Sequence, residues 1–176
     1  SDTHGNDWSN SPLFFDIATL EWSRLYPDDD PSTYRVNSQG IPVAGVDGDH
    51  PWAMHTFGAV DYDPVGDALI VSSYPQHLEP GRFTDVLADV WPKIRRHPTW
   101  ILDLETNKWR PLPGRAAHFF PYATAYDSHR RVIIGYKSAG VFELDVRSGL
   151  WHRATPKGLL GYGNNAVYDT HQRALV

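Results

Sequence analysis

The sequence predicts an all-β protein built from a repeated unit, and two recurring phrases carry that prediction. An apolar run followed by Asp-x-x-Thr/Ser-x-x-Trp occurs three times, at 16–22, 103–109 and 145–151. A second phrase ends in Tyr-Asp and precedes a β-rich run, and its copies are 60–63, 124–127 and 166–169. Because one small sheet cannot bury both of its faces alone, this repetition indicates a solenoid, an array or a propeller of four-stranded units.

The Tyr-Asp phrase predicts the hairpin that joins the first and second strands of each unit. Asp63, Asp127 and Asp169 begin the turns, and a strand-forming run follows each of them. His129 and His171 occupy the same turn position in successive units, so we expect them to be turn residues. The expected strands of these hairpins are 58–62, 68–73, 121–126 and 131–136.

The Asp-x-x-Thr/Ser-x-x-Trp phrase predicts the hairpin of the third and fourth strands. Side-chain oxygens of Asp and Thr cap nearby backbone N–H groups in a tight turn, and Asn107 and Gly149 tolerate a left-handed backbone. Trp22, Trp109 and Trp151 open the returning strand, and we expect all three to be mostly buried between neighbouring sheets. The expected strands are 99–104, 108–111, 140–145 and 150–153.

This strand order, with Pro-Leu-Pro at 111–113 shortly after a Trp, resembles the kelch-type β-propeller, the blade family shared with galactose oxidase. The Gly-Gly pair that usually ends the second strand is absent, since Ser72-Ser73 and Gly135-Tyr136 stand there, so the chain is similar to a divergent member or a relative. The resemblance implies antiparallel blades around a central channel. WD40 blades have a similar period, but no Trp here is followed by Asp, and a β-sandwich of short strands is the other alternative.

The repeats divide the chain as one partial propeller domain, 1–176. We expect two full blades, flanked by a half-blade of third and fourth strands and a half-blade of first and second strands; the boundaries are 1–25, 26–112, 113–155 and 156–176. Joining the halves would give three blades, whereas propellers typically have about 4–8. The sequence therefore predicts a piece of a longer protein, with the rest of the propeller as its partner.

Two insertions interrupt the first full blade. Residues 28–50 are polar and turn-rich, which predicts a loop. In the second insertion, apolar residues recur at helical spacing before Pro92, which predicts a two-turn helix packed on the blade; they are Phe83, Val86, Leu87, Val90 and Trp91. Both insertions and the leading segment 1–8 emerge on one rim of an up-and-down sheet, where long loops commonly carry function.

Composition limits the partners and the compartment. The net charge is −5, and the one basic run, 93–96, is too short for a nucleic-acid track. No stretch approaches the roughly 18 apolar residues of a membrane span, so neither nucleic acid nor a membrane is an expected partner. The chain has no Cys, which excludes disulfides and thiolate metal sites here and suits an extracellular or periplasmic protein.

The insertion-bearing rim is the predicted ligand site. The residues expected to bind there are Arg115, His118, His55, Trp52, His50, Trp8 and His4. His55 and His118 stand out because they precede the first-strand Tyr by seven or eight residues and so lead into the innermost strand. Two interpretations are open: the imidazoles cap exposed backbone, or they bind an anionic or hydroxylated ligand, or a divalent metal with Asp2, His4 or Asp49.

The predicted function is that of a binding scaffold for a carbohydrate or protein ligand, since aromatic rim residues such as Trp8, Trp52, Trp91 and Tyr74 stack on sugars and anchor interfaces. The alternative is a carbohydrate-active enzyme such as a polysaccharide lyase. His55 or His118 and Tyr122 would then transfer protons, and Arg115 would neutralise a uronate carboxylate. A purely structural role is the third possibility. No cofactor is expected, and the copper-radical cofactor of galactose oxidase needs a Cys that this segment lacks.

Overall fold

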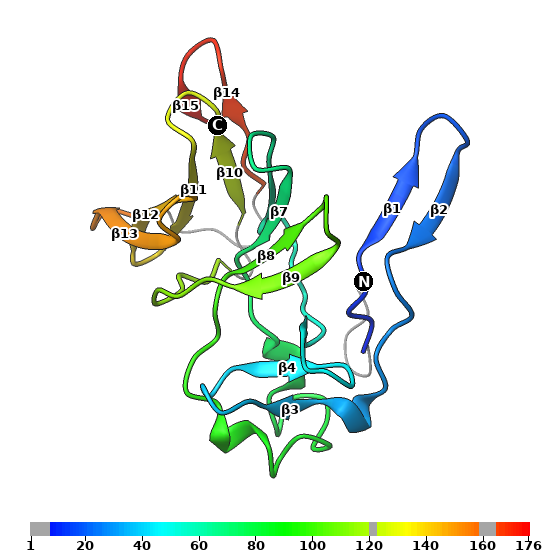
Figure 1. Cartoon of the computed structure of the whole chain (residues 1–176). Helices are drawn as coiled ribbons and strands as arrows, with labels where there is room; N and C mark the ends of the chain where they lie inside the picture. The colour runs from blue at the N-terminus through cyan, green and yellow to red at the C-terminus, as the bar shows by residue number, and fades with distance from the viewer. Residues whose placement is uncertain (1–7, 120–122, 159–164) are drawn as a thin grey trace. The chain divides into compact units, whose positions relative to one another are not determined.

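The computed structural model describes residues 8–119, 123–158 and 165–176. These residues form strands and short 3-10 helices, and every strand pair is antiparallel (Figure 1). The all-β prediction is therefore confirmed. The chain divides into two compact units: one holds the described residues up to His55 together with Pro75–Arg95, and the other holds Thr56–Tyr74 and the described residues from Arg96 onward.

The second unit contains two four-stranded sheets and one two-stranded sheet. The first sheet consists of β6 (Val60–Asp63), β7 (Ala68–Val71), β8 (Trp100–Asp103) and β9 (Lys108–Pro111). The next consists of β10 (Thr124–Asp127), β11 (Val132–Lys137), β12 (Gly140–Asp145) and β13 (Leu150–Thr155). β14 (Tyr168–Asp169) and β15 (Ala174–Leu175) form the third. All eight predicted strands are present, and β10 contacts both β6 and β14.

The six hairpin turns that begin with the repeated Asp have the same local backbone geometry. The fourth residue after each turn Asp has a left-handed backbone, and these residues are Leu20, Asp67, Asn107, Arg131, Gly149 and Arg173. The Asp carboxylate accepts hydrogen bonds from backbone N–H groups inside its turn; Asp127 Oδ1, for example, accepts from His129 N at 2.9 Å. His129 and its equivalent His171 are thus turn residues, as predicted.

The core of the second unit lies between its four-stranded sheets. Buried aliphatic side chains from both sheets meet there, among them Ile70, Ile101, Ile133 and Leu144. Trp151 packs against this core, and its Nε1 donates to Thr99 Oγ1 at 2.9 Å. Trp109 pairs with Leu102 and Trp151 pairs with Leu144, so the two hold equivalent register positions in their sheets. Both are half-buried, which is less burial than predicted.

In the first unit, the segment predicted to be a loop folds into a sheet. Residues 28–50 contribute a 3-10 helix, Pro31–Thr33, and the strands β3 (Arg35–Val36), β4 (Pro42–Ala44) and β5 (His50–Pro51), which pair in that order. The loop prediction is wrong because a short apolar stretch, Ile41–Ala44, is buried and supplies the central strand. The insertion as a whole is mostly polar, so its overall composition does not reveal that short apolar stretch.

The predicted helix over Phe83–Trp91 is also wrong. The structure has turns there and a 3-10 helix only at Trp91–Lys93. An isolated two-turn helix is marginal in water, and the apolar stripe is not buried as one face, since Phe83 and Val86 are exposed while Leu87 is buried. Leu87 packs in the first unit's own core, with Tyr34, Trp52 and Leu78, rather than on a blade.

The first unit also contains the hairpin of β1 (Leu13–Asp16) and β2 (Glu21–Arg24), which is a two-stranded sheet. Its Trp22 is 68% exposed, against the prediction of burial. Trp22 contacts Phe15 on the partner strand, with ring centroids 5.0 Å apart. The repeat predicts this hairpin correctly, but it does not supply the neighbouring strands that would bury it.

Candidate functional site

The predicted rim residues are distributed over both units. Trp8, His50, Trp52 and His55 belong to the first unit, and Arg115 and His118 belong to the second. His4 and Tyr122 lie outside the described residues. The predicted rim residues therefore form two separate groups, one in each unit.

His50 belongs to a polar network that ties the chain ahead of β1 to β5. Its Nδ1 lies 2.8 Å from Asp29 Oδ2, and its ring stacks on Tyr26 with centroids 3.8 Å apart. Asn10 Nδ2 donates to the same Asp29 oxygen at 2.7 Å and to the Pro51 carbonyl at 3.0 Å. The His50 imidazole thus serves the packing of the small sheet in this structure.

The aromatic residues expected to be exposed at the rim largely form the core of the first unit. Trp52 is 1% exposed, and its Nε1 donates to the Val43 carbonyl at 2.9 Å. Its ring lies 5.5 Å from that of Tyr34, and Trp8 meets Tyr34 edge-on at 5.2 Å. The expected exposure of Trp52 is wrong because the insertions fold around it. Trp8 and Trp91 are half-buried against the same core.

His55 is buried in the first unit and stacks on His77. The two rings are nearly parallel, at 3°, with centroids 4.1 Å apart. Leu78, the residue after His77, is buried in the core of that unit, so the 3-10 helix Gln76–Leu78 fixes the position of the pair. His55 is thus held by ring packing.

His118 lies with His97 and Tyr74 in the second unit. Its Nε2 is 2.9 Å from the His97 carbonyl oxygen, so Nε2 carries the proton and donates it. Its ring centroid is 4.9 Å from that of Tyr74. Burial lowers the pKa of His118, and burial together with the nearby His118 lowers the pKa of His97 to about 4. Both imidazoles are neutral at pH 7, and the carbonyl contact is the geometry that the capping interpretation predicts.

Two cations accompany His118. Lys137 Nζ donates to the His118 carbonyl at 3.3 Å and lies 4.9 Å from the centre of the Phe142 ring. Burial lowers the pKa of Lys137, and the positive charge of Arg115 lowers it further. Arg115 itself is exposed. This pair makes the surface beside His118 attractive to an anion.

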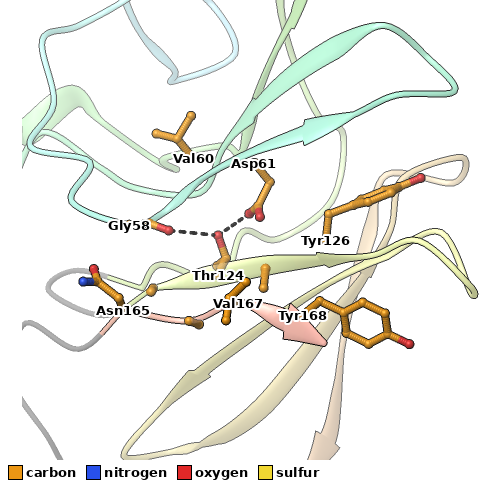
Figure 2. A pocket seen from close by; sticks show the side chains of 11 residues that line it. Gly58, Val60, Asp61, Thr124, Tyr126, Asn165, Val167 and Tyr168 are labelled. Atoms are coloured by element: carbon orange, nitrogen blue, oxygen red, sulfur yellow. Dashed lines mark hydrogen bonds between the residues drawn. The ribbon is translucent and has the colours of Figure 1, made fainter. Parts of the chain in front are cut away.

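An open cavity of about 450 Å³ lies at the start of the first strands of all three sheets of the second unit (Figure 2). Its lining comes from three stretches that precede or enter β6, β10 and β14: Gly58, Val60 and Asp61; Ala123–Tyr126; and Asn165–Tyr168. The volume falls in the range of small-molecule sites, about 300–1,000 Å³. The connections that precede β6, β10 and β14 enter their sheets at this cavity.

Asp61 is the carboxylate in this lining. It is 9% exposed and accepts a hydrogen bond from the Thr124 hydroxyl (Figure 2). It also accepts one from the backbone N–H of Tyr126. Burial raises its pKa to about 6 despite those two hydrogen bonds. The equivalent positions of β10 and β14 carry Ala125 and Val167, so Asp61 departs from the repeat.

The cavity walls are joined by a repeated tyrosine contact. Tyr126 OH donates to Asp63 Oδ1 at 2.8 Å, which connects β10 to the turn after β6. Tyr168 OH lies 3.1 Å from His129 Nδ1, which connects β14 to the turn after β10. The Tyr-Asp phrase therefore positions neighbouring sheets as well as building their hairpins.

Asp61, Thr124 and Asn165 were not among the site residues predicted from the sequence. The prediction rested on histidine and arginine residues in the loops, which are usual carriers of proton transfer and anion binding. The available signal was in the three aligned phrases, which read Val-Asp-Tyr-Asp, Thr-Ala-Tyr-Asp and Ala-Val-Tyr-Asp. A charged residue at a position where the other repeats have an apolar residue indicates a role other than packing.

Among the described residues, no three His, Cys, Asp or Glu side chains are arranged so that they could hold a metal ion. No helix in that part of the chain is long and apolar enough to cross a bilayer. No family model matches the chain, and no curated protein matches its sequence. What the cavity offers chemically is a buried acceptor, Asp61, with the hydroxyl of Thr124 and the amide of Asn165 in the same lining.

Proposed function

We propose that the chain is a segment of a propeller-type binding scaffold and that it binds a carbohydrate in the cavity at the start of β6, β10 and β14. The resemblance of its repeats to kelch blades supports the scaffold. So do the up-and-down order of both four-stranded sheets and the contacts of β10 with β6 and β14. A secreted or periplasmic location fits such a binder and stays a prediction.

Asp61 is the observation that carries the choice of ligand. A carboxylate that lines a cavity can accept hydrogen bonds from sugar hydroxyl groups, and the Asn165 amide both donates and accepts. The same negative charge repels a uronate or a phosphate. A neutral oligosaccharide is therefore the ligand class that suits this lining best.

Asp61→Ala tests the proposal, because it installs the residue that the next repeat has at the same position. Binding of the chain to an array of neutral oligosaccharides, followed by calorimetry on the best of them, should show affinity that Asp61→Ala weakens more than tenfold, about 1.4 kcal/mol. His171→Ala, in an exposed turn, is the matched control and should bind normally. Failure of the parent chain to bind any neutral glycan, or unchanged affinity in Asp61→Ala, would contradict the proposal.

The cationic pair beside His118 favours a second candidate function, the polysaccharide lyase. A lyase needs a positive charge next to the uronate carboxylate and a neutral base, and Arg115, Lys137 and His118 have those properties. However, His118 Nε2 is already bonded to a carbonyl. Uronate oligosaccharides on the same array, and the ultraviolet absorbance of an unsaturated product, separate this candidate from the neutral-glycan binder. Arg115→Gln should abolish binding only if the uronate site exists.

A further inference from the structure

Lys137 differs from the other lysines of the chain in its surroundings. It is half-buried at the end of β11, whereas the other three lysines are exposed; these are Lys93, Lys108 and Lys157. The register of the two four-stranded sheets places Ser73 at the equivalent position after β7, and Ser73 is buried. The repeated unit therefore does not require a cation at this position.

The Lys137 amine lies among groups that do not neutralise its charge. Its Nζ is 4.9 Å from the centre of the Phe142 ring and 5.7 Å from that of Phe119, which is buried. It donates a hydrogen bond to the His118 carbonyl oxygen at 3.3 Å. Within the described ranges, no carboxylate forms an ion pair with Lys137. Because lysine is rarely buried without such a partner, packing alone does not explain this residue.

The electrostatic surroundings of Lys137 favour its neutral amine. Burial lowers the pKa of Lys137, and the positive charge of Arg115 lowers it further. His118 adds no charge at pH 7, because burial lowers its pKa as well. Desolvation and a neighbouring cation are two means by which proteins make a lysine nucleophilic. Lys137 therefore has the surroundings of a reactive amine, together with a nearby guanidinium that can hold an anion.

We propose that Lys137 is a covalent site for small carbonyl compounds that carry an acid group. The Lys137 amine forms an imine with the carbonyl carbon, and the guanidinium of Arg115 binds the carboxylate of the same molecule. A guanidinium suits a carboxylate because two parallel N–H groups can donate to its two oxygens. A 2-oxo acid is the class of compound that combines the carbonyl and the carboxylate.

The reaction balances without a further reactant. The Lys137 nitrogen attacks the carbonyl carbon, the C–O π bond breaks, and one amine hydrogen moves to the oxygen as a proton. The resulting carbinolamine loses its hydroxyl group together with the second amine hydrogen as water, and a C=N bond replaces the C=O bond. Nothing is oxidised or reduced, so the step needs no oxidant or reductant.

The proposed covalent site is separate from the cavity that contains Asp61, since neither Lys137 nor Arg115 lines that cavity. It shares these two residues with the uronate candidate, but it uses the Lys137 amine as a nucleophile rather than as a charge. The proposal therefore does not rest on glycan binding, and either can fail without the other.

Reductive trapping on the full chain tests the proposal. The chain is incubated at pH 7 with glyoxylate, the simplest 2-oxo acid, and with sodium cyanoborohydride, which reduces an imine to a stable secondary amine. Mass mapping of peptides then gives the rate of labelling at each lysine. Lys137 should be labelled severalfold faster than each of the three exposed lysines, although it is the least accessible of them. Labelling of Lys137 no faster than that of the exposed lysines would overturn the proposal.

Arg115→Gln tests the role of the guanidinium. The labelling rate of Lys137 is measured with glyoxylate and with acetaldehyde, which has no acid group, and the ratio of the two rates should fall severalfold in Arg115→Gln. The ratio cancels any effect of Arg115 on the amine itself, because both aldehydes react with the same amine. The matched control is Arg147→Gln, which changes an exposed arginine in the turn after β12 and should leave the ratio unchanged. An unchanged ratio in Arg115→Gln, or an equal fall in Arg147→Gln, would overturn the proposal.

Discussion

The hairpins β1–β2 and β8–β9 are copies of one sequence phrase in two surroundings. Each turn begins with an Asp whose carboxylate accepts hydrogen bonds from backbone N–H groups. In each turn the residue four positions later has a left-handed backbone. Yet Phe15 is 43% exposed, whereas Leu102, at the same register position, is 0% exposed. The phrase determines the hairpin, and the strands and sheets around it determine how much of the hairpin is buried.

This difference has an energetic consequence. Burying a large apolar side chain contributes roughly 1.5–3 kcal/mol, so the same hairpin adds much more to folding stability in a complete sheet than it does alone. In β8–β9 the adjacent strand β7 and the core of the second unit supply that burial. In β1–β2 only the contact within the hairpin, such as Phe15 with Trp22, is present.

The largest expected effect comes from truncating the two equivalent side chains. Leu102→Ala should lower the free energy of unfolding by about 2–5 kcal/mol, because it leaves a cavity in a packed sheet. Phe15→Ala should cost less than about 1 kcal/mol, because the Phe15 side chain is already 43% exposed. Urea unfolding of both variants measures the difference. Equal losses would mean that β1–β2 is as well packed as β8–β9.

A smaller effect on the free energy of unfolding should come from Asp61, the buried carboxylate of β6. The pKa of Asp61 is about 6 in the folded chain, above its ordinary value of 3.8, because burial disfavours the ionised form. The folded state therefore holds this proton more tightly than the unfolded state does. Stability from this group is greatest below pH 4 and falls, by on the order of 2 kcal/mol, as pH rises to about 6. Asp61→Asn should remove that dependence.

The comparison with Asp61→Asn is needed because His97 acts in the opposite direction. Burial lowers the pKa of His97 from 6.5 to about 4, so its contribution to stability is lost as pH falls through that range. Subtracting the unfolding free energies of Asp61→Asn from those of the parent chain, from pH 4 to 7, isolates the carboxyl. A difference that does not change with pH would show that Asp61 ionises normally.

The hairpins of the second unit could be predicted from sequence because their determinants are local. An Asp at the turn, a residue that accepts a left-handed backbone and alternating apolar residues are all visible in each phrase. Arrangement into a closed propeller stays a prediction, because it depends on how sheets pack across long separations in sequence.

The structure of the two insertions could not be predicted from the sequence. Trp52 looked like an exposed rim residue, but strands from the first insertion and Leu87 from the second enclose it. That core joins two segments far apart in the chain, and no periodicity in either segment reveals it. The site was missed for a related reason: Asp61 is unusual only when it is compared with Ala125 and Val167 of the other repeats.

Hydrogen exchange tests the central claim most directly. The account predicts that the amides of β8 are protected, since β8 is paired on both edges. The amides of β1, which pairs only with β2 among the described residues, should exchange much faster. Equal protection of β1 and β8 would contradict the account.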